Sequence, residues 1–152
     1  MIHTMQQTHV DAVLRLQKQW EMEEITYGVV APTREQMIES LSPFNLVAID
    51  NEEVIGFLIA DMKEKSELCV FPSGASYLEI EDLYIRKDYR SKGIGEMLLR
   101  HCEELARKMC GTGCFLVSSA TKNAEKIRRF YEKNDYQIWT TVFFKRVGEQ
   151  KD

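Results

Sequence analysis

The chain has 152 residues, of which 44% are hydrophobic and 29% are charged, and its formal net charge is −4. This length and composition predict one folded domain with its own core, spanning 1–152, and they exclude a disordered or fibrous chain. The negative net charge argues against a nucleic-acid partner, because binding to a phosphate backbone depends on accumulated positive charge.

Membrane insertion and metal binding are also not expected. The longest apolar run, residues 54–60, is far shorter than the ~20 residues that cross a bilayer, and the first fifteen residues form no uninterrupted hydrophobic signal segment. We therefore expect a cytoplasmic protein with no membrane partner. The cysteines form no Cys-x-x-Cys pair and have no histidine at zinc-ligand spacing, which predicts reduced thiols. They are Cys69, Cys102, Cys110 and Cys114.

The first half of the chain predicts a strand, two helices and a hairpin. Residues 2–5 are expected to form the strand, and Thr8 is expected to cap the first helix. The second helix is expected at about 32–41, where a proline suits the first turn. Two short apolar runs, 44–50 and 54–62, are separated by three polar residues and predict the hairpin. A loop-like stretch follows.

The next predicted strand, 77–86, has an apolar pattern that changes parity midway, from Leu78 and Ile80 to Leu83 and Ile85. A regular strand cannot place both pairs on one face, because successive side chains alternate between faces. A one-residue slip near Glu81 and Asp82 would do so, and this is what a β-bulge inserts, often beside an active site. The alternative is a strand that is buried on both faces.

The second half of the chain continues the alternation. A helix is expected from Ile94 to just before Gly111, because apolar residues recur there at three- and four-residue steps. A short strand at 114–118, a helix at 123–133 and one or two aromatic-rich strands at 136–147 complete the chain. This order of elements predicts the α/β class in one layered domain.

The strand at 77–86 and the following helix are joined by a turn that contains two glycines. Glycines let the backbone approach a ligand closely, and the N–H groups at a helix start suit a phosphate. The turn lacks the lysine of a P-loop and the third glycine of a dinucleotide fingerprint. It is either an anion-binding turn or only a tight connection. Its sequence is Arg90-Ser91-Lys92-Gly93-Ile94-Gly95.

Two motifs give the chain a resemblance to a known family. Arg90, Gly93 and Gly95 match the signature Arg/Gln-x-x-Gly-x-Gly/Ala, and the later segment 123–136 resembles a helix that ends in Phe-Tyr-Glu-Lys-x-Gly-Phe. Together, and in this order, they resemble the GNAT superfamily of acetyl-CoA-dependent N-acetyltransferases over roughly residues 2–147. Asp135 stands where the family has glycine, and aspartate can also take the left-handed conformation.

The resemblance implies a fold and a cosubstrate. The fold would be a single α/β domain with a mixed, mostly antiparallel twisted sheet, flanked by helices, whose fourth and fifth strands splay apart. Acetyl-CoA would bind there, without a metal. The turn would hold the pyrophosphate, with positive charge from Arg86, Lys87 and Lys92 nearby. The residues implied in acetyl-CoA binding are Leu83, Tyr84, Ile85, Arg90, Ser91, Lys92, Gly93, Ile94, Gly95 and Asn123.

Acetyl transfer to an amine needs a base, because an alkylammonium with a pKa near ~10 has no free lone pair at neutral pH. Glu81 holds the position of the candidate base in several small-amine acetyltransferases of the family, with Glu79 and Asp82 as rivals. Tyr131 resembles the family's general acid, which protonates the departing thiolate. The alternatives are a surface carboxylate at Glu81 and a packing role for Tyr131.

The function that we predict is direct acetyl transfer from acetyl-CoA to a primary amine. We expect a small cationic amine, attracted by the acidic residues of the N-terminal half, which include Glu21, Glu23, Glu24 and Glu35. A non-catalytic acetyl-CoA sensor and a structural interaction protein are the alternatives. The aromatic C-terminal segment either contacts a second subunit, giving a homodimer, or closes the core.

Overall fold

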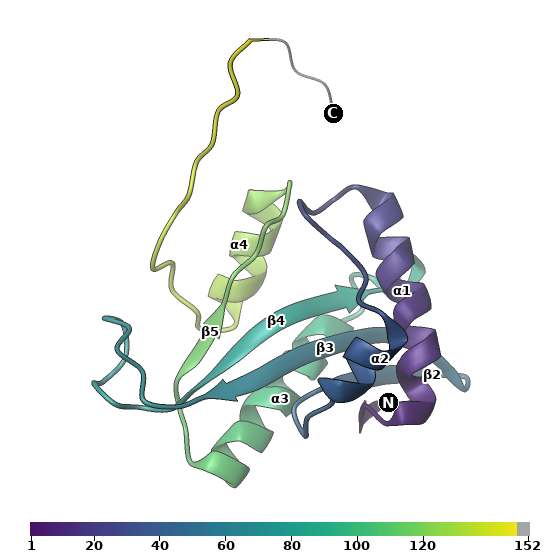
Figure 1. Ribbon diagram of the computed structural model, residues 1–152, viewed down its shortest axis with the longest axis horizontal. Coiled ribbons are helices and arrows are strands. Elements are labelled where there is room, and N and C mark those ends of the chain that lie inside the picture. The colour runs from purple at the N-terminus through teal and green to yellow at the C-terminus, as the bar shows by residue number, and fades with distance from the viewer. Residues whose placement is uncertain (149–152) are drawn as a thin grey trace.

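A five-stranded sheet forms the centre of the structure, a computed structural model that describes residues 1–148 (Figure 1). The strands follow one another across the sheet in chain order. All neighbouring pairs are antiparallel except the last, which is parallel, so the sheet is mixed and mostly antiparallel, as predicted. The strands are β1 (Ile2–Thr4), β2 (Leu46–Asp50), β3 (Glu53–Lys63), β4 (Tyr77–Ile85) and β5 (Phe115–Val117).

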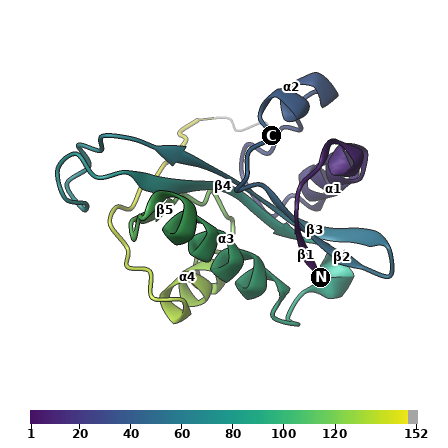
Figure 2. The same ribbon diagram turned by 90° about the horizontal axis from the view of Figure 1, so that it is seen from below.

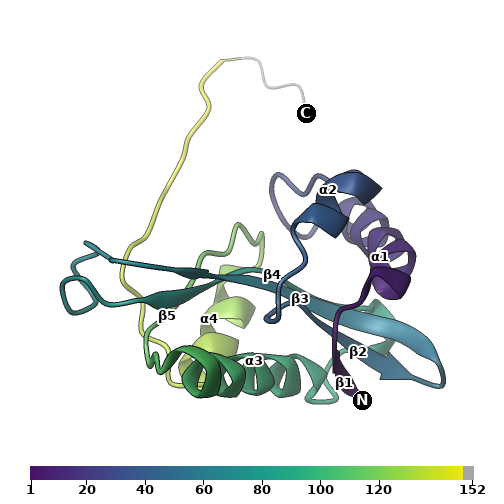
Figure 3. The same cartoon turned by 60° about the horizontal axis from the view of Figure 1, so that its bottom comes forward.

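Helices cover both faces of this sheet and make a three-layered structure. Figures 2 and 3 show α1 (Val10–Glu23) and α2 (Arg34–Glu39) on one face, and α3 (Ile94–Cys110) and α4 (Ala124–Lys133) on the other. Two clusters of buried apolar side chains fill the spaces between the layers, one on each face. The predicted α/β class is therefore confirmed, because each element buries its apolar side against the sheet.

Local sequence signals explain most of the element boundaries. Thr33 caps α2 by accepting a hydrogen bond from the Gln36 N–H at 3.1 Å, and the Gln36 side chain accepts from the Thr33 N–H at 2.9 Å. Asn51 and Glu52 turn the β2–β3 hairpin with φ angles of 48° and 64°. Thr8 was wrongly predicted as a cap. It lies inside a short 3-10 helix (Gln7–His9) that precedes α1 and that a Gln6–His9 capping box begins.

β4 contains the predicted bulge. Its pairing with β3 shifts by one residue, from Ile59 opposite Asp82 to Ala60 opposite Ile80, so that Glu81 is the extra residue. The shift puts all four apolar residues of the strand on the side of α3: Leu78, Ile80, Leu83 and Ile85. The parity change in the sequence is explained by this bulge.

β4 and β5 splay apart from the bulge onward. Their parallel pairing joins Leu78–Ile80 to Phe115–Val117 and ends there. Beyond it, β4 continues beside β3 alone, and β5 leads into α4. The divergence of these two strands places the site described below.

The predicted strands at 136–147 are wrong. In the described part of the chain, nothing after α4 joins the sheet, and residues 137–147 run away from it as the yellow trace in Figure 1. Val142 and Phe143 are 87% and 89% exposed. β-branched and aromatic residues favour strands only where a neighbouring edge can pair with them, and this segment leaves α4 on a path away from β5.

Candidate active site

A cavity of about 1060 Å³ opens where β4 and β5 diverge. Its walls come from the two strands, the glycine turn before α3, helix α4 and the segment that joins α1 to α2. Its volume is near the upper end of the range for pockets that hold small molecules and cofactors. The cavity is therefore large enough for two substrates that meet inside it.

Nearly all of the residues that the sequence singled out lie in the wall of this cavity. Among the predicted catalytic and acetyl-CoA-binding residues, Lys92 is the exception, because it lies outside the wall with its ammonium group 5.0 Å from the centre of the Tyr89 ring. Of the two rival carboxylates, Asp82 lines the cavity and Glu79 lies outside it. The predicted residues in the wall are Glu81, Leu83, Tyr84, Ile85, Arg90, Ser91, Gly93, Ile94, Gly95, Asn123 and Tyr131.

The edge of β4 that faces the cavity presents backbone polar groups. On the opposite edge, the Arg86 N–H donates to the Ile55 carbonyl of β3 at 2.8 Å. Backbone groups of an antiparallel strand alternate between its two edges, so those of Tyr84 also point to β3. The N–H and C=O groups of Leu83 and Ile85 therefore point away from β3, toward the cavity.

The glycine turn brings further N–H groups to the cavity. Ser91 and Gly93 have φ angles of 63° and 82°, in the left-handed region. Gly93 is the residue directly before α3. Because glycine has no side chain, Gly93 cannot accept hydrogen bonds from the N–H groups in the first turn of the helix. A Cβ atom at Gly93 would meet nothing within 4 Å, so the space beside the turn is open. This geometry suits a phosphate group.

The bulge puts a carboxylate with a raised pKa in the cavity wall. Partial burial raises the pKa of Glu81 above its usual range. The charge of Lys63 opposes this shift, whereas the neighbouring charges of Asp82, Glu79 and Asp61 add to it. A carboxylate with a raised pKa holds a proton more readily, which is what a general base at neutral pH requires.

Asp82 follows Glu81 in β4 and lies on the face of the sheet that α1 covers. It pairs with Ile59, whose side chain belongs to the cluster on that face. Burial raises the pKa of the Asp82 carboxyl, and a hydrogen bond with Gln17 of α1 partly opposes the shift. Asp82 is therefore a second carboxylate with a perturbed pKa in the same wall.

Tyr131 reaches the cavity from α4. The rings of Phe130 and Tyr136 pack edge-on against its ring, with centroids 5.0 Å and 5.4 Å away. Burial raises the pKa of the Tyr131 hydroxyl to about 12. The hydroxyl is protonated at neutral pH, as an ordinary tyrosine is, and the raised pKa makes it a weaker acid.

Polar residues set both ends of α4. The Asn123 side chain accepts a hydrogen bond from the Lys126 N–H at 3.2 Å and so caps the helix at the cavity wall. Asp135 follows the helix with a φ angle of 70°. It takes the left-handed conformation that the sequence predicted for this position.

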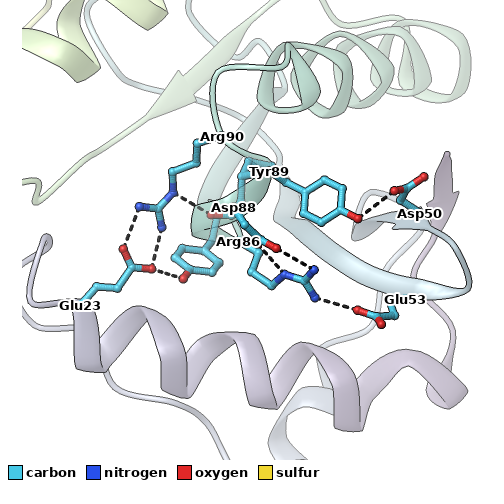
Figure 4. A network of polar contacts seen from close by, with 9 residues as sticks. Glu23, Asp50, Glu53, Arg86, Asp88, Tyr89 and Arg90 are labelled. Carbon is cyan, nitrogen blue, oxygen red and sulfur yellow. Dashed lines mark hydrogen bonds and ion pairs between the residues drawn. The ribbon is translucent and has the colours of Figure 1, made fainter.

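Two arginine–carboxylate networks lie side by side near the start of α3, as Figure 4 shows. In one, Arg90 pairs with Glu23, the last residue of α1, through two hydrogen bonds of 2.7 Å and 2.6 Å. In the other, Arg86 pairs with Glu53 at 2.8 Å and with Asp88 at 2.8 Å. Two carboxylates thus pair with the Arg86 guanidinium, and Arg86 lies outside the cavity wall. Positive charge from Arg86 near a pyrophosphate stays a prediction.

The N-terminal acidic residues do not line the cavity as expected. Glu23 is paired with Arg90, and Glu21, Glu24 and Glu35 are exposed residues outside the wall. Among the described residues, the carboxylates in the wall are Glu81, Asp82 and Glu96.

The sequence interpretation missed the contribution of α1 and the segment after it. Gln17 is 3% exposed and lines the cavity beside Trp20. Its place among apolar residues at helical spacing was a signal, because a polar residue on the buried face of a helix needs a partner.

The segment after α1 also forms backbone hydrogen bonds with the chain beyond β5. Its contacts are a bridge between Thr26 and Thr121, Tyr27 N–H to Ala120 C=O at 2.8 Å, and Lys122 N–H to Ile25 C=O at 2.9 Å.

Residues 1–148 contain neither a metal-binding cluster nor a membrane-spanning helix. Within this range, no three histidine, cysteine, aspartate or glutamate side chains gather closely enough to hold a metal ion. The helices of the same range also lack the length and apolar character that crossing a bilayer requires.

The splayed mixed sheet, with a glycine turn at the gap between β4 and β5, is the arrangement that the resemblance to acetyltransferases implied. The model of the acetyltransferase (GNAT) family matches residues 10–136. The chain therefore belongs to this family, as its motifs predicted.

Known proteins agree with this assignment. An "Uncharacterized N-acetyltransferase in pepI 3'region" of Lactobacillus delbrueckii subsp. lactis is 31% identical over 88 residues, which are 58% of this chain. The matched stretch covers 47% of that protein, so the chain spans about half of its length. Among solved structures, a tetramutant of the BH1408 protein from Bacillus halodurans has a TM-score of 0.77 at 14% identity, with 97% of this chain and 99% of that chain covered.

A second solved structure, an aminoglycoside N-acetyltransferase AAC(6')-Iy in complex with CoA, has a TM-score of 0.70 at 15% identity. The comparison covers 97% of this chain and 99% of that one. At these identities the two structures show that the fold is shared.

Proposed function

We propose that residues 1–152 form one N-acetyltransferase domain that moves an acetyl group from acetyl-CoA directly to a primary amine, with a small cationic amine as acceptor. The observation that carries the proposal is one cavity that joins an open strand edge, an anion-binding turn, two carboxylates and a protonated tyrosine hydroxyl. Membership of the family and the CoA complex of a neighbouring structure support acetyl-CoA as cosubstrate.

The residues present suit acetyl-CoA. The pantetheine arm would pair with the backbone of Leu83 and with the Ile85 N–H, which point to the cavity. The Ile85 carbonyl already accepts a hydrogen bond from Arg90 Nε at 2.9 Å. The pyrophosphate would bind the N–H groups of the turn from Ser91 to Gly95, where the space beside Gly93 is open. Asn123 at the start of α4 would contact the arm, and Lys92 would add charge from outside the wall.

Glu81 is the proposed base. An ammonium group must lose a proton before its nitrogen can attack the thioester carbonyl, and Glu81 lies in the wall with a raised pKa. As the carbon–nitrogen bond forms, the carbon–sulfur bond breaks, and Tyr131 donates its hydroxyl proton to the departing thiolate. The new amide nitrogen loses its second proton to solvent, and Tyr131 regains a proton from solvent. Asp82 is the second candidate for the base, because burial raises its pKa in the same wall.

Two carboxylates at the bulge favour a cationic acceptor. Glu81 and Asp82 would attract a positively charged amine into the cavity and would disfavour an anionic one. The solved neighbour that acts on aminoglycosides is consistent with a polycationic small molecule in this class.

The test is turnover of acetyl-CoA with a panel of amines, measured as release of free thiol. Small cationic primary amines are expected to give the fastest release. A preference for neutral or anionic acceptors would contradict the proposed acceptor class. Binding of acetyl-CoA without thiol release from any amine would favour the non-catalytic sensor.

The two carboxylates can be separated by their pH profiles. Loss of the base should reduce the rate most at lower pH, where little free amine is present, and least at high pH. Glu81→Gln should show this profile and Asp82→Asn should not. The reverse result would assign the base to Asp82.

We also propose a homodimer in the cytoplasm. The four cysteines are free thiols, in agreement with a reducing compartment. The segment 137–147 exposes Val142, Phe143 and Phe144 at 87%, 89% and 69%, although the Phe144 ring also packs edge-on against Tyr27 at 5.5 Å. Exposed apolar side chains so close in sequence are typical of a protein contact. Light scattering should give twice the chain mass, and Phe143→Ser should reduce it. A parent that is monomeric at micromolar concentration would refute the dimer.

A further inference from the structure

The side chain of Arg90 points away from the glycine turn that it begins and toward the end of α1 (Figure 4). Its two terminal nitrogens donate to the two carboxylate oxygens of Glu23, at 2.7 Å and 2.6 Å. Its Nε donates to the Ile85 carbonyl at the cavity edge of β4, at 2.9 Å. Arg90 therefore ties the turn, the strand edge and α1 together.

This ion pair is shielded from solvent. The side chains of Arg90 and Glu23 are only 24% and 18% exposed. Tyr84 of β4 donates a further hydrogen bond from its hydroxyl to Glu23, and the Arg90 guanidinium lies 5.3 Å from the centre of the Tyr84 ring. Removing one partner from such a pair leaves a poorly solvated charge behind, so the loss of either partner is costly.

Glu23 lies directly before residues 25–32, most of which line the cavity. Acetyl-CoA at the turn and at the strand edge would leave this part of the wall to the acceptor, so we refer to it as the acceptor side. Glu24 has a left-handed φ angle of 55° and turns the chain out of α1 into residues 25–32. Trp20 stacks on Tyr84 with centroids 5.2 Å apart, and its indole N–H donates to the Thr26 hydroxyl at 3.0 Å. A continuous set of contacts thus runs from the turn to this segment.

We propose that Glu23 and Arg90 are positioning residues that couple the glycine turn to residues 25–32, so that acetyl-CoA bound at the turn orders the acceptor side of the cavity. The inference rests on the proposed function, because it takes the turn as the acetyl-CoA site. A ligand that orders the turn also fixes Arg90, and the ion pair passes that restraint to the end of α1. The coupling is reciprocal, so acceptor binding should also strengthen acetyl-CoA binding.

Hydrogen exchange with acetyl-CoA tests the coupling without turnover. In the parent, saturating acetyl-CoA should slow amide exchange both at 91–97 and at 24–30. In Glu23→Gln, which keeps the shape of the side chain and removes its charge, the slowing should remain at 91–97 and disappear at 24–30. In steady-state kinetics, the same variant should raise KM for the amine by about tenfold, in the range of coupling between sites, with a smaller change in kcat.

Glu53→Gln is the matched control. Glu53 forms the neighbouring ion pair with Arg86, at 2.8 Å, and both residues lie outside the cavity wall. This variant loses the same kind of ion pair. Because that pair does not connect the glycine turn to residues 25–32, the variant should keep the exchange pattern and the amine KM of the parent. A role of Glu23 in stability alone would lower the melting temperature of its variant without moving the amine KM.

The outcomes separate the inference from the function. A parent that does not bind acetyl-CoA would refute both. A parent that binds acetyl-CoA without slowing of exchange at 24–30, or a Glu23→Gln protein with the full slowing, would refute only the coupling. If Glu23→Gln does not fold, Tyr84→Phe removes one hydrogen bond to Glu23, keeps the ring, and should reduce the slowing at 24–30 in part. Full slowing in that variant would also refute the coupling.

Discussion

At the scale of single residues, Tyr131 shows how packing sets the chemistry of one hydroxyl. Phe130 and Tyr136 pack against its ring, and burial raises its pKa to about 12. An unperturbed tyrosine hydroxyl is already protonated at neutral pH, so burial makes this hydroxyl a weaker acid without changing its protonation state there. A thiolate that leaves the thioester needs a proton at that moment. The packing and acid roles that the sequence left as alternatives are therefore compatible in one residue.

Tyr131→Phe should lower kcat by about 10²- to 10⁴-fold, the usual contribution of a general acid, with little change in acetyl-CoA affinity. The substitution keeps the ring and removes only the oxygen. Tyr136→Phe is the control, because the Tyr136 hydroxyl donates to Glu103 at 2.6 Å and that residue is not in the cavity wall. It should keep kcat. An unchanged kcat in Tyr131→Phe, with chemistry as the slow step, would leave Tyr131 as a packing residue.

Gly56 is needed where β3 passes close to β4. A Cβ at this position would lie 2.7 Å from Ile85 Cδ1 and 3.0 Å from the Tyr84 carbonyl oxygen. Gly56→Ala should therefore destabilise the fold by about 1–3 kcal/mol, the usual effect of overpacking, and weaken acetyl-CoA binding at the displaced strand edge. Chemical denaturation measures the first effect. Gly113→Ala, where a Cβ meets nothing within 4 Å, should stay within about 0.5 kcal/mol of the parent.

At the scale of elements, the bulge of β4 does two things at once. The extra residue, Glu81, lets apolar residues on both sides of it pack against α3. The parallel pairing with β5 ends at Ile80, just before the bulge, and β5 then diverges from β4. One inserted residue thus lets the whole strand pack against α3, and it lies where the cavity between β4 and β5 begins.

The start of α3 gives a second prediction at this scale. Gly93→Val should abolish the rise in melting temperature that acetyl-CoA causes in the parent, because the side chain would enter the open space beside the turn. The φ angle of 82° also strains any side chain there. Gly111→Val controls for that strain, because Gly111 ends the same helix with a φ angle of 66° and open space around it. It should destabilise the protein and keep the acetyl-CoA effect. Undiminished binding to a folded Gly93→Val protein would refute the turn as the pyrophosphate site.

At the scale of the whole molecule, the Glu23–Arg90 pair joins the end of α1 on one face of the sheet to the turn that leads into α3 on the other. Burial by itself would raise the pKa of Glu23, but hydrogen bonds from Arg90 and Tyr84 and the charge of Arg90 outweigh it and hold the pKa below its ordinary value of 4.5. A carboxyl whose pKa is lower in the folded state stabilises the fold above its unfolded pKa. The stabilisation is lost as the pH falls through the folded pKa.

The free energy of unfolding should therefore fall more steeply with acid in the parent than in Glu23→Gln. The difference in stability between the two proteins should be constant near neutral pH and should shrink as the pH falls below about 4.5. Urea unfolding at a series of pH values measures it. A difference that stays the same down to pH 3 would show that the charge of Glu23 does not contribute.

The sequence by itself determined the elements and their order, with the exception of the C-terminal strands. Capping residues such as Thr33, the periodicity of α3 and the parity change at Glu81 are local signals, and local backbone preferences decide them. The glycine turn and the left-handed Asp135 were predictable for the same reason. These features were enough to identify the family and to place most of the cavity wall.

Only the tertiary structure decided which distant residues meet. Glu23 and Arg90 are 67 residues apart, Gln17 reaches Asp82 from another layer, and Thr26 bridges to Thr121 beyond β5. Periodicity shows which side of a helix is buried but not what lies against it, because that depends on how the layers pack. The segment 137–147 has the composition of a strand, yet pairing requires a neighbouring edge, and the path of the chain after α4 takes the segment away from the sheet.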